Sequence, residues 1–403
     1  MIGASIAEQT PLDRLRAALL ADPSAQDRLA AVVDRHDAIA ALADYAAAAG
    51  IPLDQDTLTQ QLLRDPLGFD RFTNAPANAL HAPGPQWLPT GIGSDGSSYV
   101  VDWAHYGPRP LHESFFEEPL RRARNRPVSQ AVQCRTPLAA LIEDAELSRQ
   151  PPPDGLIFHM SRCGSTLVAQ VLAALSGSVV ISEAPPLDAA VQIAQAQPEL
   201  PLDLRAALVR NMAAALLSDR LGNTRRRFIK LDCWHALALP LLHAAFPDTP
   251  WLFLFRDPLP VMLSHEAMPG SQTVLGEKAQ AYGIDDPFSL SRSEYAARAL
   301  AAVCHAGTDH AGLGRGIFVD YAELPGAIAG RIFPHFGVAA DALPPEALAR
   351  VLSRDSKMPQ ADWDPSRQAP KQAASPVLVE IAERILAPAV QRLAALAERG
   401  ASA

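Results

Sequence analysis

One stretch in the second half of the chain is suited to binding an anion, both by its predicted turn and helix and by its side chains. The sequence GLIFHMSRCGSTLVAQVLAAL, from Gly155 to Leu175, predicts an apolar strand, a turn of small residues and then a helix. Backbone N–H groups in the first turn of a helix have no partner within the helix, and the helix dipole adds partial positive charge there. The stretch therefore predicts an anion site built from Arg162, Cys163, Gly164, Ser165 and Thr166.

The residue types in this turn fit that prediction. Gly164 lets the backbone approach an anion closely, and Ser165 and Thr166 add hydroxyl donors. Arg162 brings a full charge on a planar fork of donors. The alternative is an ordinary strand, turn and helix in which Ser165 and Thr166 only cap the helix.

The loop differs from the loop that binds nucleoside triphosphates. That loop follows the pattern GxxxxGK[ST], in which a lysine comes between the glycine and the hydroxyl residue. Here Gly164 is followed directly by Ser165. The missing lysine weakens the hypothesis of a kinase or ATPase.

The version SRCGSTL, with a basic residue two places before the glycine, resembles the 5′-phosphate loop of sulfotransferases, above all their protein-tyrosine and carbohydrate branches. Cys163 stands where that family usually has serine. The resemblance covers roughly residues Gly155 to Leu324 and implies 3′-phosphoadenosine 5′-phosphosulfate (PAPS) as donor. It implies in-line transfer of the sulfuryl group to a hydroxyl or amine of a small-molecule or peptide acceptor. No metal is expected, because sulfuryl carries less charge than phosphoryl.

A second anion motif follows in WLFLFRDPLPVMLSH, from Trp251 to His265. The pattern predicts a buried strand that ends at Arg256 and a helix that carries Ser264 eight residues later. The resemblance implies that Arg256 and Ser264 hold the 3′-phosphate of the donor. Alternatively, an Arg-Asp-Pro sequence at a strand end only caps the next helix and forms an ion pair. With the first loop, the motif predicts a clamp for two phosphates, with Arg162 nearest the transferred group.

Between the two motifs lie candidates for the reacting centre. Glu183 ends the strand VVIS, and the resemblance implies a general base there, with partial burial raising its pKa toward the working range. Lys230 ends the strand RRRFIK, and the resemblance implies that it stabilises charge on the leaving phosphate, although the spacing is looser than in the family. Alternatively, Glu183 caps a turn or pairs with an arginine, and Lys230 is a surface lysine. Asp232 and His235 are further candidates.

Other residues of the second half are tied to the family by position only. Tyr321 resembles the family's Val-x-Tyr-Glu-x-Leu strand end, which marks the fold. The polar, basic segment Arg354 to Lys371 lies where sulfotransferases often close a loop over the 3′-phosphate, and it offers Lys357, Arg367 and Lys371. His159 and His265 flank the two motifs, but a single histidine near a strand end is more often structural.

The elements that must position these residues alternate along the chain. Apolar runs predict strands at Leu156–Met160, Val179–Ser182, Phe228–Leu231, Trp251–Phe255 and Ile317–Asp320. Helices are predicted at Ser165–Leu175, Leu204–Leu221, His235–Phe246 and Leu259–Ala267. Strands this apolar are usually buried on both faces of a parallel sheet. The predicted fold class is α/β, a doubly wound parallel sheet in three layers.

Three regions are predicted along the chain: helical residues 1–64, a mixed α/β segment at 65–150, and a P-loop domain at 151–403. In the first region, Pro11 and Pro23 follow the cap residues Thr10 and Asp22. The run from residue 21 to 58 resembles the leader domain named after nitrogen-fixation gene clusters, which implies a protein partner. The alternative is a generic helical cap.

The mixed segment contains GIGSDG, the letters of a dinucleotide-binding loop, at residues 91–96. That loop must follow a strand and open a helix. Here a strand-like run, Ser98 to Trp103, comes next. The glycines therefore predict a hairpin turn.

The composition narrows the class of protein. The 403 residues are 48% hydrophobic and 20% charged, which is typical of a globular protein. A net charge of −9 disfavours a nucleic-acid partner, because such surfaces are usually basic. The four cysteines form no CxxC pair, so neither a zinc cage nor a disulfide framework is indicated. We expect no membrane segment and no signal peptide, and hence a cytoplasmic protein.

Three functions remain open from the sequence. The leading one is a PAPS-dependent sulfotransferase. The second is an ATP-dependent P-loop kinase or phosphotransferase. The third is a non-catalytic protein that binds a nucleotide or recruits a peptide.

Overall fold

The computed structural model describes residues 10–62, 77–111, 113–358, 360–362, 364 and 374–401. The chain divides into two compact units. Unit 1 comprises Met1–Pro110, Glu117–Gln150 and Asn211–Gly222, and unit 2 comprises Leu111–Phe116, Pro151–Arg210 and Asn223–Ala403. Helix α11 (Leu202–Leu216) begins in unit 2 and ends in unit 1.

Four helices open unit 1, namely α1 (Pro11–Leu20), α2 (Pro23–Ala31), α3 (Arg35–Ala48) and α4 (Gln55–Gln61). Each begins after a side chain that accepts a hydrogen bond from the first helical turn, and these caps are Thr10, Asp22, Asp34 and Asp54. The caps and prolines predicted for α1 and α2 are confirmed. Leucines at helical spacing, including Leu15, Leu19, Leu42 and Leu58, are fully buried.

Unit 1 also contains a three-stranded antiparallel sheet in the order β1-β2-β3. Its strands are β1 (Trp87–Ser94), β2 (Tyr99–His105) and β3 (Arg135–Pro137), and its short helices are α5 (Glu117–Arg124), α6 (Pro127–Val132), α7 (Leu138–Ile142) and α8 (Ala145–Ser148). The turn between β1 and β2 is held by the Asp95 carboxylate, which accepts from the backbone N–H groups of Ser97 and Ser98. The GIGSDG run is therefore part of a hairpin, as predicted.

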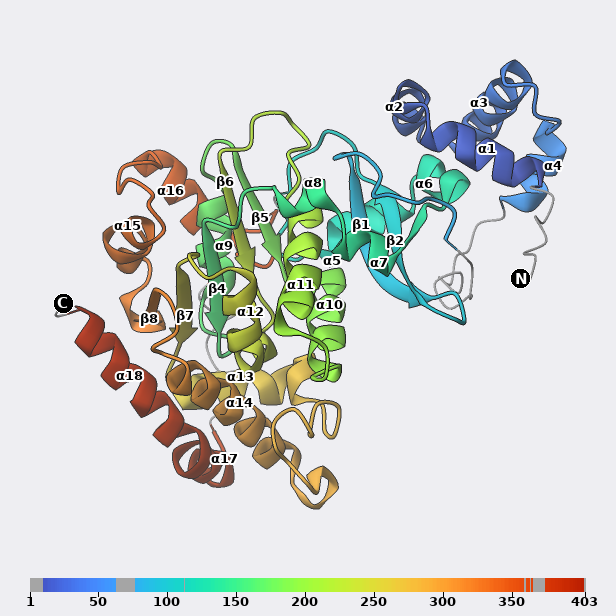
Figure 1. Ribbon diagram of the computed structural model, residues 1–403. Helices are drawn as coiled ribbons and strands as arrows, with labels where there is room; N and C mark the ends of the chain where they lie inside the picture. The colour runs from blue at the N-terminus through green and yellow to red at the C-terminus, as the bar shows by residue number, and fades with distance from the viewer. Residues whose placement is uncertain are drawn as a thin grey trace. The chain divides into compact units, whose positions relative to one another are not determined.

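Unit 2 is built on a parallel five-stranded sheet in the order β5-β6-β4-β7-β8. The strands are β4 (Gly155–His159), β5 (Ser178–Ser182), β6 (Arg226–Lys230), β7 (Trp251–Phe255) and β8 (Gly316–Asp320). All five were predicted, with ends that differ by at most two residues. Every residue of β4, β5 and β7 is buried, because helices lie on both sides of the sheet (Figure 1). Unit 2 therefore has the predicted α/β architecture.

Besides α11, the α-helices of unit 2 are α9 (Ser165–Ala173), α10 (Pro185–Ala196), α12 (Leu239–Ala245), α13 (Pro258–Ala267), α14 (Arg292–Asp309), α15 (Phe333–His335), α16 (Pro345–Leu352), α17 (Pro376–Ile381) and α18 (Ala387–Ala401). Short 3-10 turns are η2 (Cys233–Ala238), η3 (Ser271–Thr273), η4 (Pro287–Ser289) and η5 (Tyr321–Glu323), and π-helical turns are η6 (Ile328–Ile332) and η8 (Ala382–Leu386). None of the described helices has both the length and the apolar character needed to cross a membrane.

Two of the predicted helices differ from the structure by more than one or two terminal residues. The helix predicted at 235–246 is a 3-10 turn, η2, followed by α12. Helix α11 ends at Leu216 and not near Gly222, and the Arg220 guanidinium donates to the Leu216 carbonyl over 3.1 Å. That bond supplies a donor for a carbonyl at the helix end, where the helix itself provides none.

The strand order fixes where a ligand site can form. From β4 the chain continues to β5, which is the strand at one edge of the sheet. From β7 it continues to β8, which is the strand at the other edge. Right-handed crossovers place the helices that follow these two neighbouring strands on opposite faces. In sheets of this topology, the usual ligand position is at the carboxyl ends of two such neighbouring strands, here β4 and β7. Both predicted anion motifs follow these two strands.

Candidate functional site

The loop after β4 holds two side-chain-bearing residues in a left-handed backbone conformation. The φ angles are 81° at Ser161, 54° at Arg162 and 84° at Gly164. Such values are costly for residues other than glycine and persist only where surrounding contacts enforce them. The Ser161 N–H donates to His159 Nδ1 over 3.0 Å, and Gln272 Nε2 donates to the Ser161 hydroxyl over 2.7 Å. The loop is therefore fixed in its shape before any ligand arrives.

Gly164 is the one position of the loop that requires glycine for space as well. A Cβ atom built there would lie 2.8 Å from Leu324 Cδ1 and 2.9 Å from Tyr321 Cδ2. Gly164 is also the N-cap of α9, and no side chain caps this helix. Ser165 and Thr166 lie inside the first turn, so they do not act as the capping pair of the alternative interpretation. The N–H groups of that turn are left to a ligand.

The side chains of Arg162 and Cys163, between Ser161 and Gly164, make different contacts. The Cys163 thiol is fully buried and donates to the Leu254 carbonyl of β7 over 3.2 Å, and burial raises its pKa to about 12. Cys163 can therefore meet a ligand only through its backbone. The Arg162 guanidinium donates to the Met268 carbonyl after α13 over 2.9 Å, which holds its charge beside the loop.

A buried ion pair lies at the ends of β5 and β6. The Lys230 ammonium contacts Glu183 Oε1, and the side chain of Lys230 is only 1% exposed. His159 Nε2 lies 3.4 Å from the same oxygen. Since His159 Nδ1 accepts from Ser161, the ring proton is on Nε2, which donates to the Leu231 carbonyl over 2.9 Å. Lys230 is therefore not a surface lysine, and Glu183 pairs with a lysine and not with an arginine.

The ion pair corrects one expectation about Glu183. Burial by itself would raise the pKa of this carboxyl, as expected from the sequence. The charge of Lys230 and the hydrogen bond from His159 outweigh burial and hold the pKa of Glu183 well below its usual value. Glu183 is thus ionised and neutralised by Lys230. It also has a positive φ of 51°, so its position is enforced by the fold.

Arg256 joins the second motif to the first. Its guanidinium stacks on the Tyr321 ring at 4.1 Å and donates from Nη1 to the Arg162 carbonyl over 3.4 Å. Capping of α13 is done by Asp257, whose carboxylate accepts from the Leu259 N–H. Arg256 is therefore not the cap of this helix. Ser264 lies half-buried on α13, and among the described residues no hydrogen bond joins its hydroxyl to the loop.

Two further segments of unit 2 complete the site. Ser114 donates to the Ser356 carbonyl, and the Phe115 ring lies 5.4 Å from Lys230 Nζ. Nothing in the sequence pattern indicated the segment around Ser114 and Phe115. Lys357 follows Ser356 and is exposed, yet burial by the surrounding protein, Arg162 and Lys230 lower its pKa to about 8.

Lys357 was predicted for a loop over the 3′-phosphate. Besides burial, the charges of Arg162 and Lys230 lower its pKa and that of Glu183 raises it, and its place over the 3′-phosphate stays a prediction. Arg367 and Lys371 lie outside the described residues. His265 is buried and structural, with Nδ1 accepting from the Gly270 N–H over 3.3 Å.

A second polar cluster lies beside the ion pair, built from α10 and η2. Asp188 Oδ1 accepts from Trp234 Nε1 over 2.7 Å and from His235 Nε2 over 2.9 Å. Asp188, Asp232 and His235 place ligand-type atoms within 4.8 Å of one another. Both nitrogens of His235 are already engaged, because Nδ1 accepts from the Asp232 N–H over 3.3 Å. We therefore assign the cluster to hydrogen bonding and not to a metal.

Comparison with known proteins yields structural likenesses only. No family model matches the chain, and no curated protein matches it by sequence. The sulfotransferase domain from the olefin synthase of Synechococcus PCC 7002 is 18% identical, with a TM-score of 0.35, over 62% of this chain and 95% of that one. Sulfotransferase STF9 from Mycobacterium avium is 12% identical, with a TM-score of 0.35, over 58% and 79%. The sulfotransferase domain from the curacin biosynthetic pathway is 16% identical, with a TM-score of 0.35, over 61% and 97%.

Proposed function

We propose that the chain is a sulfotransferase that moves a sulfuryl group from PAPS to a hydroxyl or amine acceptor by in-line displacement. The observation that carries the proposal is the link between the two anion motifs. Arg256, at the end of β7, stacks on Tyr321 and donates to the carbonyl of Arg162 in the loop after β4. PAPS carries a 5′-phosphosulfate and a 3′-phosphate on one ribose. It therefore suits two anion sites that are held at a fixed distance from each other.

The donor fits the two sites in one orientation. The loop and the uncapped first turn of α9, with the hydroxyls of Ser165 and Thr166, suit the 5′-phosphosulfate. Arg256 and Ser264 suit the 3′-phosphate. Because the loop lacks the lysine that triphosphate enzymes use, this assignment is favoured over ATP.

Lys230 is placed to stabilise charge that builds on the bridging oxygen as the bond to sulfur breaks. Its ammonium is buried, and a buried charge acts strongly because little water screens it. Arg162 adds a second cation next to the loop. Glu183, which the resemblance implies as general base, is one candidate for receiving the proton of the acceptor, and Asp232 is another.

Calorimetry with 3′,5′-adenosine bisphosphate tests the proposal. We expect Arg256→Ala to weaken binding by about 10- to 100-fold, since a hydrogen bond to a charged group contributes about 1.5–3 kcal/mol. Arg315→Ala is the matched control, because Arg315 is an exposed arginine at the amino end of β8 and donates to the Asp248 carbonyl. Failure of the unaltered protein to bind the bisphosphate would sink the proposal. Magnesium-dependent ATP turnover that survives Arg256→Ala would favour the kinase alternative.

A further inference from the structure

Three carboxylates lie at the carboxyl ends of β5 and β6, and their surroundings differ. Glu183 Oε1 is contacted by Lys230 and lies 3.4 Å from His159 Nε2. Asp188 accepts from Trp234, His235 and Gln192. For Asp232, the nearest cationic group among the described residues is His235, whose Nδ1 lies 4.0 Å from Asp232 Oδ2. That nitrogen accepts from the Asp232 N–H, so it has no proton to offer. The Asp232 carboxylate accepts from the His235 N–H at the start of η2, and among the described residues it lacks the direct ion pair that Glu183 has with Lys230.

Asp232 also faces the ion pair. Leu231 continues the strand, since its N–H donates to the Ile157 carbonyl over 3.0 Å, and Asp232 is extended with φ −67° and ψ 150°. Side chains two residues apart on an extended chain point the same way, so Asp232 lies on the side of the strand that carries Lys230. The charges of Glu183 and Lys230 both act on it.

We propose that Asp232, and not Glu183, takes the proton of the acceptor, while Glu183 holds Lys230 in place. The inference rests on the proposed sulfotransferase function and names the proton acceptor of that site. As the acceptor oxygen or nitrogen bonds to sulfur, the bond from sulfur to the bridging oxygen breaks. Its electron pair leaves with the adenosine bisphosphate. The proton of the attacking hydroxyl or amine passes to an Asp232 oxygen and later to water.

The electrostatics of the cluster agree with this role. Burial raises the pKa of Asp232 to about 7, and the neighbouring charges of Glu183 and Asp188 act in the same direction. The charge of Lys230 acts against burial without cancelling it. A proton acceptor works best when its pKa is near the working pH. Glu183, whose pKa is held low by Lys230, is a much weaker base.

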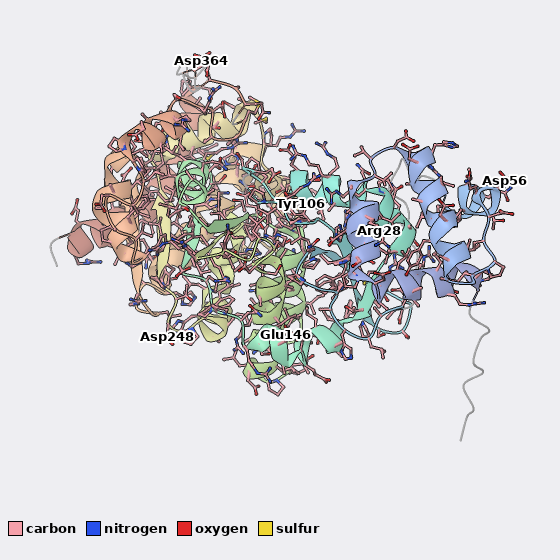
Figure 2. The ribbon with its side chains drawn as sticks, turned by 90° about the horizontal axis from the view of Figure 1, so that it is seen from above. Arg28, Asp56, Tyr106, Glu146, Asp248 and Asp364 are labelled. Carbon is pink, nitrogen blue, oxygen red and sulfur yellow. The ribbon has the colours of Figure 1, made fainter. Side chains whose placement is uncertain are left out.

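The test compares Asp232→Asn with Glu183→Gln, using release of adenosine bisphosphate from PAPS with water or phenol as the probe acceptor. We expect Asp232→Asn to lower the rate by about 10²- to 10⁴-fold and to abolish its rise with pH through 7. Glu183→Gln is expected to keep that rise. Asp248→Asn is the control, because Asp248 lies exposed on the surface, just before β7 and so at the opposite edge of the sheet (Figure 2).

The possible results separate a failure of the proposed function from a failure of the inference about Asp232 alone. If the unaltered protein binds no 3′,5′-adenosine bisphosphate, the proposed function fails and this inference fails with it. If binding is intact but Asp232→Asn keeps the rise with pH, or Glu183→Gln is the variant that loses it, the inference alone is overturned. If Asp232→Asn does not fold, or turnover with water and phenol is too slow to measure, carbon-13 NMR of labelled aspartate in the unaltered protein decides. A carboxyl that titrates near 7 supports the inference, and titration of every aspartate near 4 overturns it.

Discussion

The helices α1 to α4 of unit 1 and the carboxyl edge of the sheet in unit 2 are built in opposite ways. In α1 to α4, a side-chain cap opens each helix and leucines fill the core. At the sheet edge, Ser161, Arg162 and Glu183 are three of the four non-glycine residues with positive φ in the described chain. The same edge buries Lys230 with Glu183. Strained backbone and buried charge are thus gathered in one place.

The difference shows where the tertiary structure overrides the local conformational preferences of the residues. Local preference and tertiary structure agree in the helices, which is the condition for stable folding. At the sheet edge they disagree, and such strain and buried charge tend to cluster at functional sites. Three changes test whether the contrast is real.

The largest expected effect is that of Lys230→Met. Removing one partner of a buried ion pair leaves the other charge uncompensated, so we expect the free energy of unfolding to fall by about 3–5 kcal/mol. Adding Glu183→Leu should recover much of this loss, because both charges are then gone. Urea unfolding measures both variants.

The matched control for the ion pair is Glu118→Gln on α5, which breaks an exposed pair with Arg122. It should cost less than about 1 kcal/mol. A loss this small for Lys230→Met would show that the buried pair does not stabilise the fold.

A smaller effect is expected from glycine substitutions that differ in their surroundings. Gly164→Ala meets a backbone at φ 84° and a Cβ contact with Tyr321 and Leu324, and we expect a loss of about 2–4 kcal/mol and of bisphosphate binding. Gly50→Ala, after α3, has φ 66° but open space, so it should cost only about 1 kcal/mol from the backbone. Thermal unfolding and calorimetry compare the two. Equal costs would mean that the close packing at Gly164 has no energetic weight.

The smallest effect concerns pH. The pKa of Lys357 is lowered to about 8, so the side chain is charged below that pH and loses its charge as the pH rises through it. We expect affinity for adenosine bisphosphate to fall by up to about tenfold between pH 7 and 9, which corresponds to about 1.4 kcal/mol. Binding at pH 8 should take up protons, which calorimetry in two buffers of different ionisation enthalpy detects. Lys357→Arg stays charged, so an unchanged pH dependence in this variant would remove Lys357 from the site.

Much of the fold could be predicted from the sequence because the relevant signals are local. The apolar runs of β4 to β8 predict buried strands, and Thr10 and Asp22 predict the starts of α1 and α2. The glycine and hydroxyl residues after β4 predict the loop. The end of α11 could not be predicted this way, because no glycine or proline between Leu216 and Gly222 marks it in the sequence.

The sequence by itself determined which residues stand at the carboxyl ends of the strands, since strand periodicity and turn residues are encoded in neighbouring positions. Only the tertiary structure decided how these residues act on one another. Glu183 and Lys230 are 47 positions apart, and their contact reverses the expected direction of the pKa shift of Glu183. The same holds for Phe115 and Lys357, which reach the site from distant segments. Charge and burial depend on distances in space, and those distances are set by the packing of the whole unit.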